Sequence, residues 1–303
     1  MEPFRAGFTV MTDKVKGVRN IKMSIGLVLE GGGMRGLFTT GVLDFFLEND
    51  IEFKHIIGVS AGACHASSYI SRQPGRSFAV STDYLSDKHY CGLYSFITTG
   101  DLFGAEMIYD TIPNKLNPID YKAAAENPAV FRVVVTNCRT GQAEYPIIED
   151  MKRDTIYIRA SSSLPIVSKP VKINNELYFD GGVADSIPLA QSIKFGMLKN
   201  VVVLTRERGY MKSPNKMMPY IRMKYRKYPE LIKSIENRHI MYNNELKLIA
   251  SEEKAGRAFV ISPNQPLPCD RVEKDVEKLR ICYRLGYNAA ADSLEKLKAF
   301  LEK

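Results

Sequence analysis

The sequence predicts a three-layer α/β/α fold with a central, mostly parallel sheet and a mostly helical C-terminal portion. Two short apolar runs, at residues 25–30 and 53–60, are bounded by glycine or polar residues, as is typical of buried strands. Each run is followed by a predicted helix: residues 34–50 have apolar residues at roughly helical spacing, and residues 61–72 are rich in small residues. Such alternation of strand and helix is the usual start of an α/β fold with a parallel sheet.

The remaining elements are predicted from shorter patterns. Thr-Gly at 140–141 and Asn-Asn at 174–175 are turn residues, so each predicts a β-hairpin. Residues 92–116 mix aromatic side chains with glycine and predict loops around a short helix. We expect further strands at 129–138, 200–205 and 257–262, and helices at 186–196 and over most of the chain after residue 210.

These elements suggest one compact domain rather than two independent ones. We expect a catalytic core over residues 24–206, with the C-terminal portion, residues 207–303, packed on it as mainly helical structure. A chain of 303 residues is long enough for such a domain, and 45% hydrophobic with 25% charged residues is ordinary for a globular protein.

Composition also limits the compartment and the cofactors. No apolar stretch reaches the length of about 18 residues that a membrane-spanning helix needs. The first 20 residues lack the apolar segment of a signal peptide. Five cysteines without C-x-x-C spacing argue against a disulfide framework or a zinc site. We therefore expect a cytoplasmic protein without a bound metal.

Positive charge is concentrated in one segment. The whole chain has a formal net charge of +8, and residues 206–233 contain nine Lys/Arg but only two Asp/Glu. Aromatic and Met side chains are interleaved with these cations. The segment fits either a solvated surface helix packed on the core or a peripheral contact with an anionic membrane at its inner face. We expect no nucleic-acid partner.

A glycine-rich loop follows the first predicted strand. Gly31, Gly33 and Gly36 match the G-x-G-x-x-G pattern of dinucleotide-binding proteins. That interpretation also requires an acidic residue at the end of the second strand, to bind a ribose. Ser60 stands there instead. The alternative is a loop whose backbone N–H groups stabilise an oxyanion.

The sequence Gly-Val-Ser-Ala-Gly at 58–62 supports the second interpretation. A G-x-S-x-G pattern between a strand and a helix is typical of a nucleophile elbow, which exposes the serine hydroxyl at a helix N-terminus. Ser60 is therefore the candidate nucleophile. Its oxyanion donors are expected in the preceding loop, where glycine lets the backbone approach the substrate. The candidate residues of the oxyanion hole are Gly31, Gly32, Gly33 and Arg35, of which Arg35 could instead anchor the loop or place an anionic head group.

A serine nucleophile needs a base, and the residues leave two arrangements open. The order Ser60, Asp180, His239 suits the triad of an α/β-hydrolase, although His239 lies in a polar helical stretch. The alternative is a dyad in which Asp180, followed by two glycines, accepts the proton directly.

Taken together, these motifs resemble those of the patatin-like phospholipase family over roughly residues 24–206. The glycine loop at 31–36, the elbow at 58–62 and Asp-Gly-Gly at 180–182 occur in the family's order, and Ala-Ser-x-x-x-Pro at 160–165 matches a lesser family pattern. The resemblance implies a patatin-like fold, Ser60 as nucleophile and Asp180 as proton acceptor.

The resemblance also implies the reaction. It suggests hydrolysis of lipid esters, with phospholipids, lysophospholipids or acylglycerols as substrates and with no metal or organic cofactor. A catalytically silent lipid-binding protein is the alternative from another functional class. The C-terminal third of the chain carries no motif that indicates chemistry.

Overall fold

In the computed structural model, which describes residues 25–302, eight strands form one sheet in the order β5-β6-β3-β2-β1-β7-β8, with β4 paired to β3. Strands β3, β2, β1, β7 and β8 are parallel to one another. Strands β4 and β6 each pair antiparallel with β3, and β5 pairs antiparallel with β6. The mostly parallel sheet predicted from the sequence is therefore confirmed. The strands are β1 (Ile25–Leu29), β2 (His55–Val59), β3 (Val130–Asn137), β4 (Ala143–Glu144), β5 (Val171–Ile173), β6 (Glu176–Asp180), β7 (Lys199–Val203) and β8 (Ala258–Ile261).

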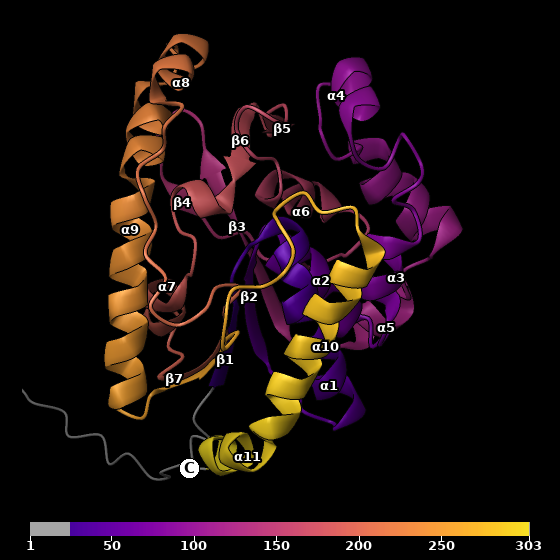
Figure 1. Ribbon diagram of the computed structural model, residues 1–303, viewed down its shortest axis with the longest axis vertical. Coiled ribbons are helices and arrows are strands. Elements are labelled where there is room, and N and C mark those ends of the chain that lie inside the picture. The colour runs from indigo at the N-terminus through magenta and orange to yellow at the C-terminus, as the bar shows by residue number, and fades with distance from the viewer. Residues whose placement is uncertain (1–24, 303) are drawn as a thin grey trace, which may run out of the picture.

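Helices cover both faces of the sheet (Figure 1). Helices α1, α2 and α10 lie on one face, and the long helix α9 lies with α7 on the other. The helical elements are η1 (Gly33–Gly36), α1 (Leu37–Glu48), α2 (Ala61–Ile70), α3 (Arg76–Thr82), α4 (Leu93–Thr99), η2 (Met107–Leu116), α5 (Tyr121–Glu126), α6 (Thr155–Ser161), η3 (Gly181–Val183), α7 (Leu189–Lys194), α8 (Met218–Lys224), α9 (Pro229–Lys254), α10 (Val276–Asp292) and α11 (Leu294–Glu302).

The buried strands have apolar side chains on both faces, as the uninterrupted apolar runs predict. In β1, Leu27 and Leu29 pack with α1 and α2, whereas Val28 points to the opposite face and packs with residues of α7 and α9. All three side chains are fully buried. This two-sided burial is typical of parallel sheets covered by helices on both faces, and it gives the sheet a core on each side.

The C-terminal portion is joined closely to the rest of the fold. Strand β8 extends the sheet by pairing with β7. Helix α10 packs against α1 so tightly that glycine is required at the contact. A Cβ atom on Gly41 would lie 2.1 Å from the carbonyl oxygen of Tyr283, and one on Gly286 would lie 1.9 Å from that of Phe38. The division of the chain near residue 206 into core and C-terminal portion stays a prediction.

Most local predictions match the structure. The Asn174–Asn175 turn has positive φ at both residues, 47° and 68°, and joins β5 to β6. Residues 92–116 are more helical than expected, because they form both α4 and η2. Within residues 25–302, none of the helices has the length and apolar character needed to cross a membrane. The prediction about a signal peptide concerns residues outside the described part of the chain.

Candidate active site

Ser60 occupies the turn between β2 and α2 that the G-x-S-x-G pattern predicted. Its φ of 53° and ψ of −122° lie outside the regions that L-residues favour, as is common where a strained turn presents a functional side chain. The turn is held in place because the Ser60 N–H donates to the hydroxyl of Ser161 at 2.9 Å. Ser60 is buried, at 7% exposure, so its hydroxyl lies inside a site shielded from bulk water.

The glycine loop lies against this elbow. A Cβ atom on Gly31 would lie 2.8 Å from the Cβ of Ser60, so glycine lets the two segments touch. Gly33 has a φ of 58°, and a Cβ there would lie 2.4 Å from the carbonyl oxygen of Arg271. Within residues 25–302, the N–H groups of Gly32 and Gly33 donate no hydrogen bond to the protein. These donors are therefore free for an oxyanion beside Ser60.

Residues from the second half of the chain anchor both ends of this loop. The Glu30 carboxylate accepts hydrogen bonds from the Thr205 N–H and the Tyr242 hydroxyl, each at 2.6 Å. At the other end, the Met34 N–H donates to the carbonyl oxygen of Arg271 at 3.1 Å. The loop is thus held in position before a substrate arrives.

Asp180, at the end of β6, is 1% exposed. Its Oδ1 accepts a hydrogen bond from the Gly182 N–H at 2.8 Å, whereas the buried Oδ2 accepts none within residues 25–302. Burial raises the pKa of Asp180, and the Arg238 guanidinium and the neighbouring Ser60 hydroxyl partly offset that rise. The carboxylate is therefore a stronger base than an exposed aspartate and has one oxygen available for a proton.

The histidine considered as an alternative base, His239, lies away from Ser60, and the nearby His65 is a poor candidate for that role. His239 is on α9, where its Nδ1 is 2.9 Å from the carbonyl oxygen of Glu236 one turn earlier, and it lines neither of the cavities beside Ser60. His65 lies on the elbow helix, close against Gly36. Burial lowers the pKa of His65 to about 4, which makes its ring neutral and a weak base at neutral pH.

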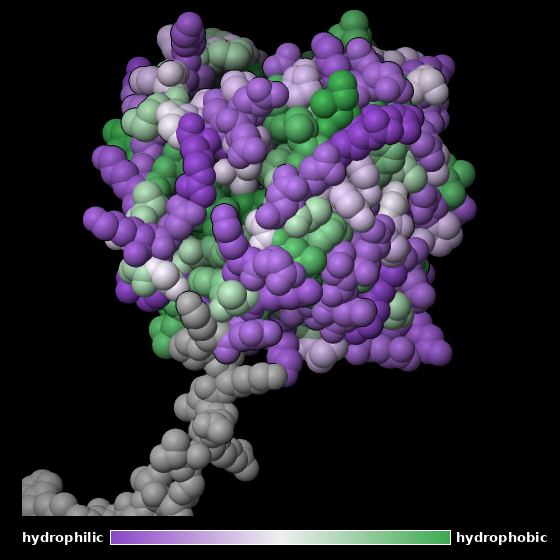
Figure 2. All heavy atoms as spheres, turned by 60° about the horizontal axis from the view of Figure 1, so that its bottom comes forward, coloured by the Kyte–Doolittle hydropathy of each residue, from purple (hydrophilic) through white to green (hydrophobic). Residues whose placement is uncertain are grey.

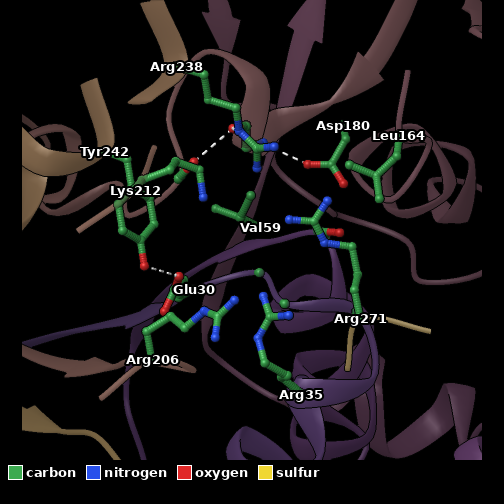
Figure 3. Close-up of a pocket in the computed structure, with 16 residues that line it drawn as sticks. Glu30, Arg35, Val59, Leu164, Asp180, Arg206, Lys212, Arg238, Tyr242 and Arg271 are labelled. Atoms are coloured by element: carbon green, nitrogen blue, oxygen red, sulfur yellow. Dashed lines mark hydrogen bonds between the residues drawn. The ribbon is translucent and has the colours of Figure 1, made fainter. Parts of the chain in front are cut away.

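Two cavities meet at Ser60, and the first is strongly cationic. We call it the cationic pocket; its charged lining consists of Arg35, Arg206, Lys212, Arg238 and Arg271, with the carboxylates of Glu30 and Asp180. Figure 3 shows the guanidinium groups of Arg35 and Arg206 side by side, with the three other cations arranged around the same space. Five cationic groups thus face two carboxylates.

The second cavity is larger and mostly apolar. We call it the apolar cavity; it has a volume of about 400 Å³ and extends from Ser60 between α2, α3, η2 and the segment 164–167. Its lining includes Leu37, Ala61, Val80, Leu102, Phe103, Ile108 and Leu164. A cavity of this size and character suits an acyl chain. Five residues line both cavities: Gly33, Ser60, Leu164, Arg238 and Arg271.

The structure brings together Ser60, Asp180, the glycine loop and Arg35, as the sequence predicted, and leaves His239 apart. Sequence reasoning missed Arg206, Lys212, Arg238 and Arg271 as residues of the site. The only available signal was the excess of cations after residue 205, which we interpreted as a surface feature. Arg238 and Arg271 lie beyond that segment and carry no local pattern.

Comparisons with known proteins identify the family of this chain. A family model described as "Patatin-like phospholipase" matches residues 27–193, and a domain of unknown function matches residues 228–302. The uncharacterized protein YjjU of Escherichia coli (strain K12) is 27% identical over 269 residues, which span 86% of this chain and 74% of that protein. A "probable lipid hydrolase 463L" of Invertebrate iridescent virus 6 is 30% identical over 57% of this chain and 65% of its own length.

More distant matches cover longer proteins. "Lysophospholipase nte1" of Aspergillus terreus is 23% identical over 98% of this chain, which spans 19% of that protein. The crystal structure of VipD from Legionella pneumophila aligns with 90% of this chain and 67% of the VipD chain, with a TM-score of 0.46 and 14% sequence identity. The family model for patatin-like phospholipases matches residues 27–193, which is more than half of this chain. The chain therefore belongs to the patatin-like phospholipase family.

Proposed function

We propose that this protein hydrolyses carboxylic esters of lipids with Ser60 as the nucleophile and Asp180 as the base. Membership in a phospholipase family indicates hydrolysis of lipid esters, and the finer assignment is supported by one juxtaposition. A serine on a strained elbow lies beside a buried aspartate with a free carboxylate oxygen, next to unbonded glycine N–H groups, at the end of an apolar cavity.

The reaction follows from these groups. Asp180 accepts the proton of the Ser60 hydroxyl as its oxygen attacks the acyl carbonyl carbon. The N–H groups of Gly32 and Gly33 donate hydrogen bonds to the resulting oxyanion, with Gly31 allowing the close approach and Arg35 adding positive charge. The alcohol leaves with the proton from Asp180, and the acyl chain remains on Ser60 as an ester.

The second half of the reaction reverses these roles with water in place of the alcohol. Asp180 accepts a proton from a water molecule, whose oxygen attacks the acyl-Ser60 carbonyl. Collapse of the oxyanion releases the fatty acid, and the Ser60 oxygen regains a proton from Asp180. The dyad is then restored, so no group outside the chain is consumed other than water.

The first test is replacement of the nucleophile. Ser60→Ala should abolish ester hydrolysis, since removing a serine nucleophile typically costs about 10⁶-fold in rate. A fluorophosphonate probe should label the wild-type protein and not this variant, while Ser251→Ala, an exposed site on α9, should be labelled normally. Labelling of the Ser60→Ala variant would contradict the assignment. A folded wild-type protein that neither reacts with the probe nor cleaves any lipid ester would support the silent lipid-binding alternative.

We further propose that the molecule contacts an anionic bilayer with the end that carries α4 and α8. Both helices lie at the same end of the molecule (Figure 1) and expose apolar side chains: Leu93 and Ile97 are 71% and 72% exposed, and Met223 is 66% exposed. The basic segment, residues 206–233, includes α8, and Lys216, Arg226 and Lys227 next to this helix in the sequence are exposed. The opposite end, turned forward in Figure 2, is mainly hydrophilic with small, scattered apolar groups.

A further inference from the structure

The cations of the cationic pocket are held together without the usual neutralising partners. Within residues 25–302, none of the five forms an ion pair with a carboxylate. Exposed cations of the basic segment, residues 206–233, do form such pairs. Arg208 pairs with Glu253 at 2.7 Å, and Arg222 pairs with Glu236. Like charges repel strongly where solvent screening is weak, so their convergence in one pocket requires an explanation.

The two carboxylates of the pocket are already engaged. Glu30 accepts hydrogen bonds from Thr205 and Tyr242, and Asp180 accepts one from Gly182 and serves as the base. Arg35 is only 7% exposed, and its Nε makes no hydrogen bond within residues 25–302. A buried, unpaired guanidinium nitrogen is costly unless a ligand supplies the missing acceptor.

Aromatic rings hold two of the cations in place. The Lys212 ammonium lies 4.1 Å from the centroid of the Tyr242 ring, and the Arg206 guanidinium lies 4.5 Å from that of Tyr210. Tyr242 is itself fixed by its hydrogen bond to Glu30. These contacts orient both side chains before any ligand binds, which lowers the entropic cost of binding.

We propose that the cationic pocket binds a phosphate group on the alcohol portion of the ester substrate. The enzyme would then select acyl esters of phosphorylated alcohols whose head group is anionic, such as monoacylglycerol phosphate. A choline or ethanolamine head group would place a further cation among Arg206, Lys212 and Arg238. The inference rests on the proposed function, because Ser60 must cleave the ester whose alcohol portion enters this pocket.

The arrangement around Ser60 is consistent with this division of the substrate. With the acyl chain in the apolar cavity, the alcohol portion is directed toward the cationic pocket. Arg35, Arg206 and Lys212 line that pocket alone, and Arg238 and Arg271 lie where the two cavities meet. The cationic pocket has a volume of about 30 Å³. By that measure it holds only about two or three water molecules, which favours a compact anion over a bulky head group.

The state of Lys212 provides an additional signature. Burial, together with repulsion from Arg238, lowers the pKa of Lys212 to about 7. An anion in the pocket would offset this repulsion and favour the charged form. The ionisable groups facing Lys212 are Glu30, Arg35, Tyr210, Arg238, Tyr242 and Arg271.

Kinetics with matched substrates test the proposal. The substrates are monoacylglycerol phosphate, monoacylglycerol and lysophosphatidylcholine with the same acyl chain. Wild type should prefer the phosphate monoester. Arg206→Gln and Lys212→Gln should each lower the ratio of kcat/KM for the phosphate ester to that for monoacylglycerol by about 10-fold or more, as expected for losing a charged hydrogen bond.

The control is Arg226→Gln, which removes one exposed cation of the same basic segment outside the pocket and should leave that ratio unchanged. A merely structural role of Arg206 or Lys212 would lower kcat/KM for all three substrates equally. Equal loss, or a wild-type preference for lysophosphatidylcholine, would overturn the proposal.

Binding without turnover distinguishes the possible sources of the phosphate. Ser60→Ala protein should bind sn-glycerol 3-phosphate in calorimetry, more tightly than inorganic phosphate and far more tightly than glycerol. Between pH 7 and 9 the phosphate is fully ionised, since its second pKa is about 6, so loss of the Lys212 proton should weaken binding. This pH dependence should disappear in Ser60→Ala/Lys212→Gln.

The possible outcomes distinguish the phosphate-binding inference from the proposed ester hydrolysis. Stronger binding of inorganic phosphate, with no head-group preference in hydrolysis, would assign the pocket to free phosphate and overturn the inference. Ester hydrolysis without any phosphate effect would overturn the inference while leaving the proposed function intact. Binding of sn-glycerol 3-phosphate through Lys212 in a protein that cleaves no ester would overturn the proposed function and leave the anion site in place.

Discussion

The two cavities that meet at Ser60 differ in chemistry and in origin. The apolar cavity is lined mainly by residues between Leu37 and Val183, which is the part of the chain that carries the family motifs. The cationic pocket takes four of its five cations from residues after 205. The proposed acyl side is thus built mainly by residues before 184, with a smaller contribution from the C-terminal portion, whereas the proposed alcohol side takes most of its cations from residues after 205. Arg206 and Lys212 line only the cationic pocket, so changes at these two residues should alter the alcohol side alone.

The largest expected effect concerns the boundary between the cavities, where Asp180 lies. Asp180→Asn removes the base and should nearly eliminate hydrolysis of every ester, whatever its acyl chain or head group. His239→Ala should retain most of the activity, because His239 lines neither cavity. Initial rates with a short-chain p-nitrophenyl ester measure both effects. Loss of activity in a folded His239→Ala variant would show that the proton leaves Ser60 by another route.

An intermediate effect should separate the acyl side from the alcohol side. Val80, on α3, is half-buried and lines the apolar cavity. Val80→Phe fills part of that cavity and should lower kcat/KM for a palmitate ester relative to a butyrate ester by roughly 10-fold. Ile240→Phe, at an exposed site on α9, is the control. An unchanged chain-length profile for Val80→Phe would mean that the acyl chain lies elsewhere.

The smallest expected effect on catalysis concerns the surface around the cavities, where changes should alter membrane binding instead. Lys216/Arg226/Lys227→Gln removes three exposed cations near α8, each worth about 1 kcal/mol at an anionic surface. Co-sedimentation with phosphatidylglycerol vesicles should fall at low salt, and the difference should shrink as salt screens the charges. Lys122/Lys247/Lys296→Gln has the same net charge but alters other surfaces. If both triple variants sediment alike, the α8 end is not the docking surface.

The motif-bearing half of the site was predictable because its signals are local. The glycine loop, the elbow at Ser60 and the Asn-Asn hairpin that leads to Asp180 each depend on backbone conformations encoded by a few neighbouring residues. The uninterrupted apolar sequences of β1 and β2 likewise indicated that both faces of the sheet are buried. The pairing of Ser60 with Asp180 itself followed from the family resemblance and not from spacing.

The other half was not predictable, because its contacts join distant segments. Glu30 and Tyr242 are 212 residues apart, yet they share a hydrogen bond beside the glycine loop. Arg238 lies on a helix whose sequence reads as an ordinary polar surface helix. Arg206 and Lys212 appeared only as part of a charged segment, and the sequence does not distinguish the cations that face inward from those that face solvent.

The anchoring of the glycine loop bears on how far this chain could be shortened. A fragment restricted to the phospholipase match, residues 27–193, would lack Thr205, Tyr242 and Arg271. Glu30 would lose both hydrogen-bond donors, and the Met34 N–H would lose its acceptor. Such a fragment would retain every recognisable motif and still leave the proposed oxyanion donors unsupported. For engineering, the smallest useful unit of this protein therefore extends at least through Arg271, well past the last motif.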